Sequence, residues 1–416
     1  MPGKNFRILS LDGGGTWSLI QVNALKTLFG TGAMPGRDVL HEFDLVVANS
    51  GGSIVLGALL ANMSLDEVLG FFTSKDKLDT IFVPASLADD TASYFLRHFL
   101  GVDIGAKYDA AAKLDGLQEV LQAYGDVPMD GLHGLMNGLN YAGRQANFVI
   151  CAFDYDAQRE TFFRSDTASL AASGTQPVPA TLAQAINASS NAPVNYFDAP
   201  APIGNRRFWD GAIGGYNNPV FAGTIEAVAN MGRYGIADTH AIACLSIGSG
   251  SVALLPPGAP GSPDPAFVAK KTKPSIPHDI IKMAESILDD PPDAASFNTH
   301  VMLGGSLTVV GGAVINGPIV RMNPLIQPVK GADGKWAAAA DLTPNDLTKQ
   351  FTPLVNLDFD AHELSDIALI QALCDSWLKD NSNNQPIRGN AITTEAEIGH
   401  GKFSQALAAW TALRDA

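Results

Sequence analysis

Short apolar runs that end in glycine-rich turns dominate the first 60 residues. Residues 8–11 run into Asp12-Gly13-Gly14-Gly15, and apolar positions then recur every three or four residues between Trp17 and Leu28. This spacing indicates a strand, a glycine turn and a helix. Residues 43–62 repeat the same order of elements. Two consecutive strand–turn–helix units predict a parallel sheet with right-handed crossovers.

Further elements are expected along the rest of the chain. Residues 73–145 carry helical patterns with scattered aromatic residues, and we expect them to cover one side of the sheet. A strand at 147–153 is expected to pair with a second strand at 160–164 across a polar turn. The remaining expected elements are a helix at 182–189, strands at 208–212, 241–247 and 319–322, and helices at 276–288, 361–378 and 394–413.

These elements predict an α/β fold in which helices lie on both faces of a mainly parallel central sheet, giving three layers. We interpret residues 1–416 as one domain, with the motif-bearing core in 5–222 and the completion of the sheet and outer helices in 223–416. Residues 255–274 are richest in Pro and Gly. They are interpreted as a surface loop of this domain, with a linker between domains as the alternative.

Composition and charge narrow the functional classes. Apolar residues make up 46% of the 416 residues and 41 residues are glycine, whereas charged residues make up only 17%. A large core is therefore within reach. The net charge of 27 − 42 = −15 opposes binding to nucleic acid and to anionic membrane surfaces. We expect no nucleic-acid partner, and we expect any contact with a membrane to be apolar and transient.

The cysteines and the amino-terminal residues indicate a reducing compartment. Cys151, Cys244 and Cys374 are odd in number and far apart, which fits neither a disulfide framework nor a zinc site. The first residues lack the basic and apolar regions of a signal peptide. Residues 301–320 are uncharged and long enough to span a bilayer, but several glycines and Pro318 would break a spanning helix. We therefore expect a cytoplasmic protein.

A serine in the second glycine turn is the first candidate for chemistry. Ser50 lies in Ala48-Asn49-Ser50-Gly51-Gly52, between the strand at 43–48 and a helix expected at 53–62. Small neighbours let the backbone turn sharply, so that Oγ is exposed in front of the free N–H groups of the helix. This pattern suits a nucleophile, and it equally suits a serine that caps a helix in a tight loop.

The other two candidates are the glycine turn and an aspartate. Amides of Gly13, Gly14 and Gly15 can converge on one anion, either an oxyanion or a phosphate. Asp12-Gly13-Gly14-Gly15-Thr16 is also similar to the phosphate loop of sugar kinases and actin-like ATPases, with 248–250 as a second phosphate loop. Asp210-Gly211 can place a carboxylate in the crevice at the strand ends, although a lone Asp-Gly pair is more often a turn.

Taken together, these motifs resemble those of patatin-like phospholipases, a family of acyl hydrolases that includes storage proteins and bacterial members. Residues 9–15 are similar to the family's oxyanion motif, 43–52 to its nucleophile elbow and 208–212 to its Asp-Gly-Gly/Ala motif. Fainter similarity continues through most of the chain. The resemblance implies the patatin-like fold and a hydrolase of lipid metabolism that cleaves fatty-acyl esters, of phospholipase A or lysophospholipase type.

The resemblance also implies a role for each candidate residue. Ser50 is expected to be the nucleophile and Asp210 its direct base, which makes a catalytic dyad without histidine. The amides of Gly13, Gly14 and Gly15 are expected to form the oxyanion hole. Such a reaction passes through an acyl-serine and needs neither a metal nor an organic cofactor. Phospholipid, lysophospholipid, galactolipid and neutral ester remain open as substrates, and so does the oligomeric state.

The chain departs from the family pattern at three positions. Trp17 and Ser18 stand where the family usually has Arg and Gly, and Ala48 replaces the first glycine of the elbow. Losing the arginine removes a fixed cation near the glycine loop, which affects either headgroup recognition or the anchoring of the loop. We expect Trp17 to pack beneath the loop, with a narrowed acyl site as the alternative. We expect Asp12 to fix the loop.

Other functions stay open on the sequence. An α/β-hydrolase would use a triad of Ser50, Asp210 and either His240 or His362. A non-catalytic storage or binding protein on the same fold would explain the departures from the family motifs. Apolar clusters at 70–72, 81–83, 94–96 and 99–100 are interpreted as helix packing, an acyl-chain tunnel or a lid that contacts lipid.

Overall fold

The computed structural model describes most of the chain as a series of segments. The described residues are 5–83, 107–168, 177–193, 196–253, 291–307, 317–327, 329–330, 336–337, 354–355, 357–358, 360–388 and 397–415. Several sequence expectations lie outside these residues, namely the loop at 255–274, the helix at 276–288 and the apolar clusters at 94–96 and 99–100.

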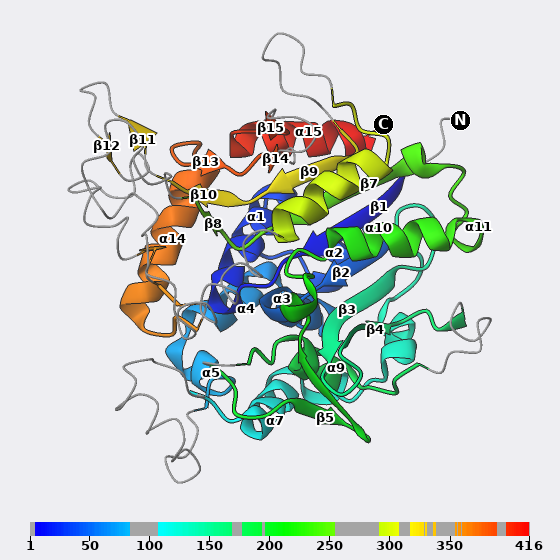
Figure 1. Ribbon diagram of the computed structural model, residues 1–416, viewed down its shortest axis with the longest axis vertical. Helices are drawn as coiled ribbons and strands as arrows, with labels where there is room; N and C mark the ends of the chain where they lie inside the picture. Colours follow the sequence, from blue (N-terminus) through cyan, green and yellow to red (C-terminus); the bar gives the residue numbers. More distant parts are fainter. Residues whose placement is uncertain are drawn as a thin grey trace.

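An eight-stranded sheet forms the middle of the molecule (Figure 1). Its order is β5-β6-β3-β2-β1-β7-β9, and β4 pairs with β3 outside this path. Strands β3, β2, β1, β7 and β9 are parallel, whereas β4, β5 and β6 pair antiparallel. This confirms the expected mainly parallel sheet. The strands are β1 (Phe6–Leu11), β2 (Leu45–Ala48), β3 (Asn147–Asp154), β4 (Arg159–Arg164), β5 (Ala201–Ile203), β6 (Arg206–Asp210), β7 (Ile242–Ile247) and β9 (Ile319–Met322).

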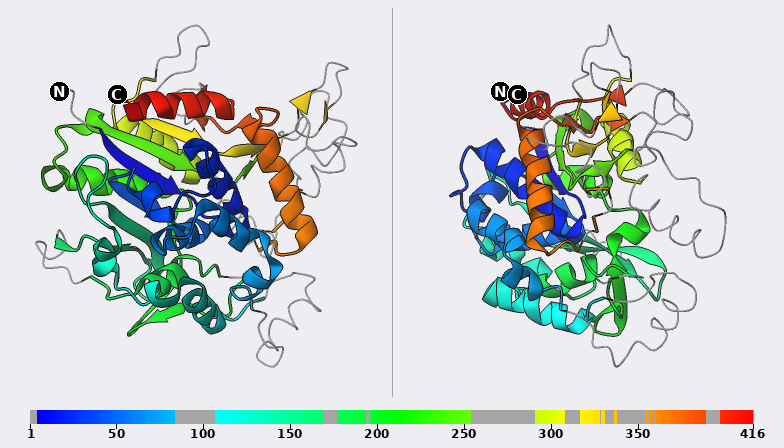
Figure 2. Two further views of the ribbon diagram at one scale, coloured as in Figure 1. Left: turned by 180° about the vertical axis from the view of Figure 1, so that it is seen from behind. Right: turned by 90° about the vertical axis from the view of Figure 1, so that its left-hand side faces the viewer.

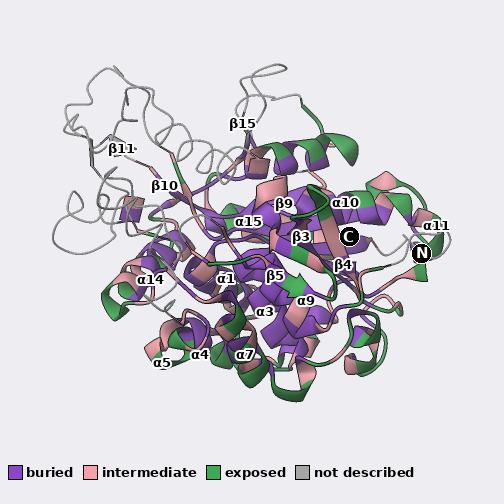
Figure 3. Cartoon of the chain, turned by 60° about the horizontal axis from the view of Figure 1, so that its bottom comes forward, coloured by how far each residue is buried: buried purple, intermediate pink, exposed green. Residues whose placement is uncertain are grey.

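Helices cover the sheet, and the exposed residues lie on their outer sides (green in Figure 3). Residues 291–302 form a helix in addition to the labelled ones. The labelled helices are α1 (Leu19–Phe29), α2 (Gly36–Leu40), α3 (Ser50–Leu60), α4 (Leu65–Thr73), α5 (Lys75–Asp79), α7 (Ala110–Leu121), α9 (Leu182–Ser189), α10 (Val220–Ala229), α11 (Met231–Tyr234), α14 (Leu364–Leu378) and α15 (Phe403–Asp415), and the 3-10 turns are η1 (Gly15–Ser18), η2 (Gln122–Tyr124), η3 (Met129–Leu135), η4 (Gly211–Gly214) and η5 (Thr239–Ala241).

Alternate residues of the central strands point into two separate cores, one on each face of the sheet. Leu9 and Val46 lie in a core with residues of α1, α3, α4, α9 and α14. Ile8 and Val47 lie in a second core with residues of α10 and of the helix at 291–302. Successive side chains of a strand point to opposite faces, so both faces of the sheet are covered. The fold is therefore a three-layer α/β/α arrangement, as the sequence predicts.

The expected helical cover lies on one of these faces. Within the described part of residues 73–145, α5, α7 and η3 place Leu78, Leu117 and Leu132 in the same core as α3. The carboxyl-terminal helix α15, red in Figure 2, packs along β9 and β7. Short strands complete the fold, as β8 (Ser251–Val252), β10 (Pro324–Ile326) and β13 (Asn383–Asn384) in one sheet, β11 (Val329–Lys330) with β12 (Trp336–Ala337), and β14 (Ile387–Arg388) with β15 (Glu397–Ile398).

Several element boundaries differ from the sequence prediction. The helix expected at 361–378 begins at Leu364, and the strand expected at 208–212 is β6, which ends at Asp210 before the 3-10 turn η4. The helix expected at 53–62 begins three residues earlier, at Ser50, because the expected turn already has helical hydrogen bonds. The expectation of a helix at 394–413 is wrong at its start. Glu397–Ile398 is a strand that pairs antiparallel with β14, and α15 begins at Phe403. An apolar residue in a short segment fits either periodicity, so sequence pattern alone does not separate the two.

The uncharged stretch at 301–320 does not form one continuous helix. Residues 301–302 end a helix, and residues 319–320 belong to the central strand β9. Among the described residues, no helix combines the length and the apolar character that crossing a bilayer requires.

Candidate active site

The sequence-predicted residues meet at the carboxyl ends of β1 and β2. Asp12 and the glycine loop follow β1, Ser50 follows β2, and Asp210 ends the antiparallel strand β6. β1 and β2 are adjacent and parallel, so their carboxyl ends lie at the same edge of the sheet. The backbone joins the two turns there, because the Asn49 amide donates to the Leu11 carbonyl at 3.1 Å. This edge is where α/β folds bind their ligands.

Ser50 occupies a sharp turn between β2 and α3. Its φ of 48° lies in the left-handed region, which a residue with a side chain rarely adopts. Gly52 permits this turn, since a Cβ at that position would lie 2.4 Å from the Leu11 carbonyl oxygen. The Ser50 amide donates to Ser189 Oγ at 2.9 Å, and the residue is 8% exposed. Backbone strain of this kind is typical of a nucleophile elbow.

Asp210 is buried beside this serine and is only 4% exposed. Its Oδ1 accepts hydrogen bonds from Asn49 Nδ2 at 3.0 Å and from the Ala212 amide at 2.9 Å. Burial raises the pKa of Asp210 above its ordinary value, while the hydroxyl of Ser50, the Ala212 and Asn49 donors and the charge of Lys113 act to lower it. The carboxylate is thus more basic than an exposed aspartate, and the Ser50 side chain lies close enough to lower its pKa.

The glycine loop lies directly against the serine. A Cβ on Gly13 would lie 3.0 Å from the Cβ of Ser50. Gly14 and Gly15 have φ of 154° and 53°, which glycine adopts readily. The three amides differ in their partners. The Gly13 amide donates to the Asn217 carbonyl at 2.8 Å, whereas no hydrogen bond between described residues is donated by the amides of Gly14 and Gly15.

Trp17 packs beneath the loop, as expected. Its side chain is buried in the core that contains α1 and α3. The indole Nε1 donates to the Asp358 carbonyl at 3.1 Å, and a Cβ on Gly250 would lie 3.4 Å from the ring. The neighbouring Ser18 is fully buried, next to Gly51 at the start of α3. Trp17 and Ser18, which differ from the family motif, therefore pack on the inner side of the loop.

Four residues that sequence reasoning did not assign to the site contribute to it. Ser189 Oγ donates to Asn49 Oδ1 at 3.4 Å. Asn49 in turn binds Asp210, and Ser189 accepts the Ser50 amide. Asn49 could have been found, since it directly precedes Ser50. Arg321 and Lys113 carry no such signal, because arginine and lysine are normally surface residues.

Lys113 is 1% exposed and lies on α7, under the dyad. Its Nζ donates to the Asn187 carbonyl at 3.2 Å and lies 4.2 Å from the centre of the Phe197 ring. Burial lowers the pKa of Lys113 well below its usual value, and the Asp210 carboxylate opposes that shift. The Asn187 carbonyl belongs to the last turn of α9, so Lys113 caps the helix that carries Ser189.

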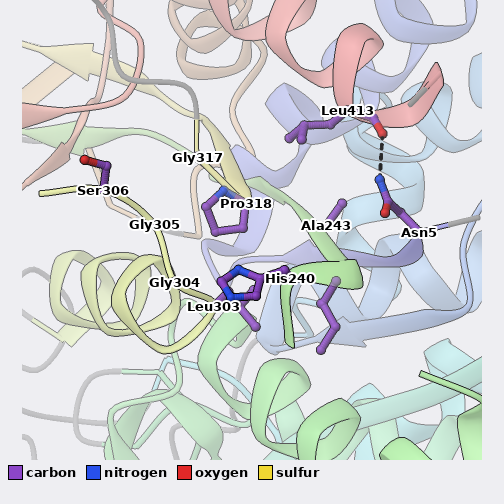
Figure 4. A pocket seen from close by; sticks show the side chains of 11 residues that line it. Asn5, His240, Ala243, Leu303, Gly304, Gly305, Ser306, Gly317, Pro318 and Leu413 are labelled. Atoms are coloured by element: carbon purple, nitrogen blue, oxygen red, sulfur yellow. Dashed lines mark hydrogen bonds between the residues drawn. The ribbon is translucent and has the colours of Figure 1, made fainter. Parts of the chain in front are cut away.

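The two histidines of the alternative triad lie elsewhere. His240 precedes β7, at the amino end of the parallel strands, where it lines a cavity of about 410 Å³ with Leu303 and Pro318 (Figure 4). His362 Nδ1 contacts the Asp360 carbonyl at 2.9 Å. No histidine is hydrogen-bonded to Ser50 or Asp210 among the described residues.

In the alternative phosphate loop at 248–250, the amides of both glycines are already hydrogen-bonded. The Gly248 amide donates to the Met322 carbonyl at 2.8 Å, and the Gly250 amide donates to Asn323 Oδ1 at 2.6 Å. Cys151, Cys244 and Cys374 are buried and form no disulfide. Within the described segments, no three side chains of the metal-binding types form a group that could hold an ion.

Comparisons with known proteins were made on both sequence and structure. The sequence profile of the family described as "Patatin-like phospholipase" matches residues 9–223, more than half of the chain. Among solved structures, the chain is similar to VipD from Legionella pneumophila, with 10% sequence identity and a TM-score of 0.33, over 90% of this chain and 67% of that one. Among curated proteins, none matches.

Proposed function

This chain belongs to the patatin-like phospholipase family, and from that premise we propose that it cleaves fatty-acyl esters of lipids through a dyad of Ser50 and Asp210. Membership of the family supports lipid acyl hydrolase activity in general. The observation that carries the finer proposal is the position of the strained Ser50 beside the buried carboxylate of Asp210, which is hydrogen-bonded to the adjacent Asn49 and whose pKa the Ser50 side chain lowers.

The proposed reaction has two steps that use the same base. Ser50 Oγ attacks the ester carbonyl carbon while its proton passes to Asp210, and the carbonyl oxygen becomes an oxyanion. Collapse of this intermediate breaks the bond to the alcohol oxygen, which takes the proton from Asp210. Water then attacks the acyl-serine, Asp210 accepts its proton, and return of that proton to Ser50 Oγ releases the fatty acid. Burial of Asp210 supports this role, since it makes the carboxylate a stronger base.

We assign the oxyanion hole to the amides of the glycine loop. The sequence predicts Gly13, Gly14 and Gly15 as donors. Among the described residues, the amides of Gly14 and Gly15 have no acceptor, which favours these two as donors to the oxyanion. The Gly13 amide already donates to the Asn217 carbonyl and therefore stabilises the loop itself. Each donor to an oxyanion contributes about 3 kcal/mol to the rate. The proposed chemistry needs neither a metal nor an organic cofactor.

The substrate is proposed to be a lipid ester of the phospholipase A or lysophospholipase type. With a net charge of −15, the chain has no general attraction for an anionic lipid surface. We therefore propose that the protein contacts a lipid substrate transiently, through apolar surface.

The dyad is tested with Ser50→Ala and Asp210→Ala, measured on a p-nitrophenyl acyl ester and with a fluorophosphonate probe. Both variants are expected to lose hydrolysis by about a thousandfold or more while keeping the melting temperature of the natural chain. Ser190→Ala is the matched control, because Ser190 is a buried serine nearby whose hydroxyl donates to the Ile186 carbonyl and, among the described residues, is bonded to neither Ser50 nor Asp210. Full activity in either dyad variant would refute the proposal, and an unlabelled natural chain would favour a non-catalytic protein.

A further inference from the structure

A buried cation lies beneath the glycine loop, although the sequence lacks the family's arginine there. Arg321, on β9, is 3% exposed. Its Nη2 forms an ion pair with Asp12 Oδ2 at 2.6 Å, and its Nη1 donates to Ser246 Oγ at 2.8 Å. Arg321 thus reaches the residue that directly precedes the loop.

The register of the sheet explains how this contact forms. Ser10 of β1, Ser246 of β7 and Arg321 of β9 are paired side by side across three parallel strands. Asp12 lies just beyond the end of β1, within reach of the long arginine side chain. The contact therefore depends on strand order, and no local sequence pattern contains it.

Asp12 is hydrogen-bonded or ion-paired to four of the elements around the site. Its amide donates to the Ile247 carbonyl at 3.1 Å, which fixes it to β7. Its own carbonyl accepts the Gly52 amide at 3.1 Å and Gln21 Nε2 at 2.7 Å, which fixes it to α3 and α1. The ion pair with Arg321 adds β9. The position of the Gly14 amide, two residues further on, follows from that of Asp12.

Stability alone is a weak reason for such a pair. Removing two charges from water costs free energy that their attraction only partly returns, and apolar replacements are often as stable. The second carboxylate oxygen of Asp12, Oδ1, is also buried and accepts no hydrogen bond from a described residue. Burial raises the pKa of Asp12 to about 6 even though Arg321 lowers it. A geometric role accounts better for a pair that is this poorly compensated.

We propose that Arg321 is a positioning residue that holds the oxyanion loop through Asp12, in a chain that has Trp17 where the family usually has an arginine. The inference rests on the proposed function, since it concerns the same oxyanion hole. A displacement of oxyanion donors by about 1 Å is enough to cost a hundredfold in rate.

Three variants test the role, each measured for kcat, KM and melting temperature on a soluble p-nitrophenyl ester. Arg321→Met is expected to lower kcat about a hundredfold with KM nearly unchanged, and Arg321→Lys is expected to restore part of that loss. The double variant Asp12→Asn with Arg321→Met removes both buried charges. We expect it to recover the melting temperature but not kcat, because the loop is then stable but no longer held in place.

A matched pair at the other end of the sheet is the control. Asp44 is buried and forms an ion pair with Arg144 at 2.8 Å, at the amino end of β2 and away from Ser50. The double variant Asp44→Asn with Arg144→Met is expected to lower the melting temperature and leave kcat unchanged.

Three outcomes are separable. Recovery of both kcat and melting temperature in the neutral Asp12 and Arg321 double variant would overturn the positioning role. The loss in Arg321→Met would then come from leaving the Asp12 charge buried without a partner. Normal kcat in a folded Arg321→Met variant would overturn it as well. If the natural chain shows neither hydrolysis nor labelling of Ser50, the proposed function fails first, independently of Arg321.

Discussion

Asn49 should tune the base, and replacing it with leucine isolates that effect. Leucine has a similar shape but cannot donate a hydrogen bond, so the buried Oδ1 of Asp210 loses the donor from Asn49, at 3.0 Å, and keeps the one from the Ala212 amide. The Asn49 donor lowers the pKa of Asp210. Its loss therefore raises that pKa, and a larger share of the base is protonated, and hence inactive, at any acidic pH.

The size of the shift follows from the hydrogen bond. A hydrogen bond to a charged group in a protein contributes about 1.5 to 3 kcal/mol, and one pKa unit corresponds to about 1.4 kcal/mol. Asn49 is fully buried, so water does not replace the lost donor. We expect the acid limb of kcat/KM to move upward by about one to two pH units in Asn49→Leu. In the natural chain we expect that limb to lie above the ordinary range of an aspartate, because burial raises the pKa of Asp210.

The assay is a pH profile of kcat/KM on a soluble ester, from about pH 4 to about pH 9, with folding followed at each pH. Ser189→Ala serves as the control, since it removes the acceptor of the Ser50 amide without removing a donor to Asp210. It is expected to lower kcat without moving the acid limb. An acid limb in Asn49→Leu at the same pH as in the natural chain, in a folded variant, would refute the reasoning.

Two further predictions concern residues that the sequence left open. Trp17→Ala should destabilise the fold by about 3 to 5 kcal/mol in a denaturant titration, because it empties a buried site, and Trp17→Phe should cost much less. An unchanged stability in Trp17→Ala would contradict the packing role. His240→Ala and His362→Ala should each keep kcat/KM within about twofold, since loss of a general base costs a hundredfold or more. A large loss in either variant would restore the histidine triad.

The sequence predicted best where structure is local. The turn after β1 and the turn after β2 each lie within a few residues of an apolar run, so pattern and residue type placed Asp12 and Ser50 at strand ends. The helix at 182–189 and the strand at 319–322 have the expected bounds for the same reason. The strand at Glu397–Ile398 was missed because its partner, β14, supplies the pairing that defines it.

The contacts that set the electrostatics of the site were beyond local pattern. Lys113 and Arg321 are buried cations, and nothing in their neighbouring residues marks them as such. Each becomes significant only because a packed helix or a strand order brings it to Asn187 or Asp12. Likewise, the occupied amide of Gly13 depends on a carbonyl from Asn217. The motif predicts a glycine loop but does not say which of its amides are free.

The proposed catalytic groups and the residues that support them come from different parts of the chain. Ser50, Asp210 and the glycine loop lie within residues 9–223, the segment that matches the family. Yet β1 pairs on one side with β7, which lies beyond that segment. From the same later region, Ser249 Oγ donates to the Gly13 carbonyl, Asp358 accepts from Trp17, and Arg321 binds Asp12.

Without these later residues, the loop would keep its sequence but lose the contacts on its inner side. Loss of the later residues would affect Ser50 and Asp210 less, because their partners Asn49, Ser189 and Ala212 all precede residue 223. The proposed nucleophile and base are therefore held by residues of the segment that matches the family, whereas the glycine loop, the proposed source of the oxyanion donors, also depends on the rest of the chain. Divergence in the later residues would consequently alter stabilisation of the oxyanion before it altered the dyad.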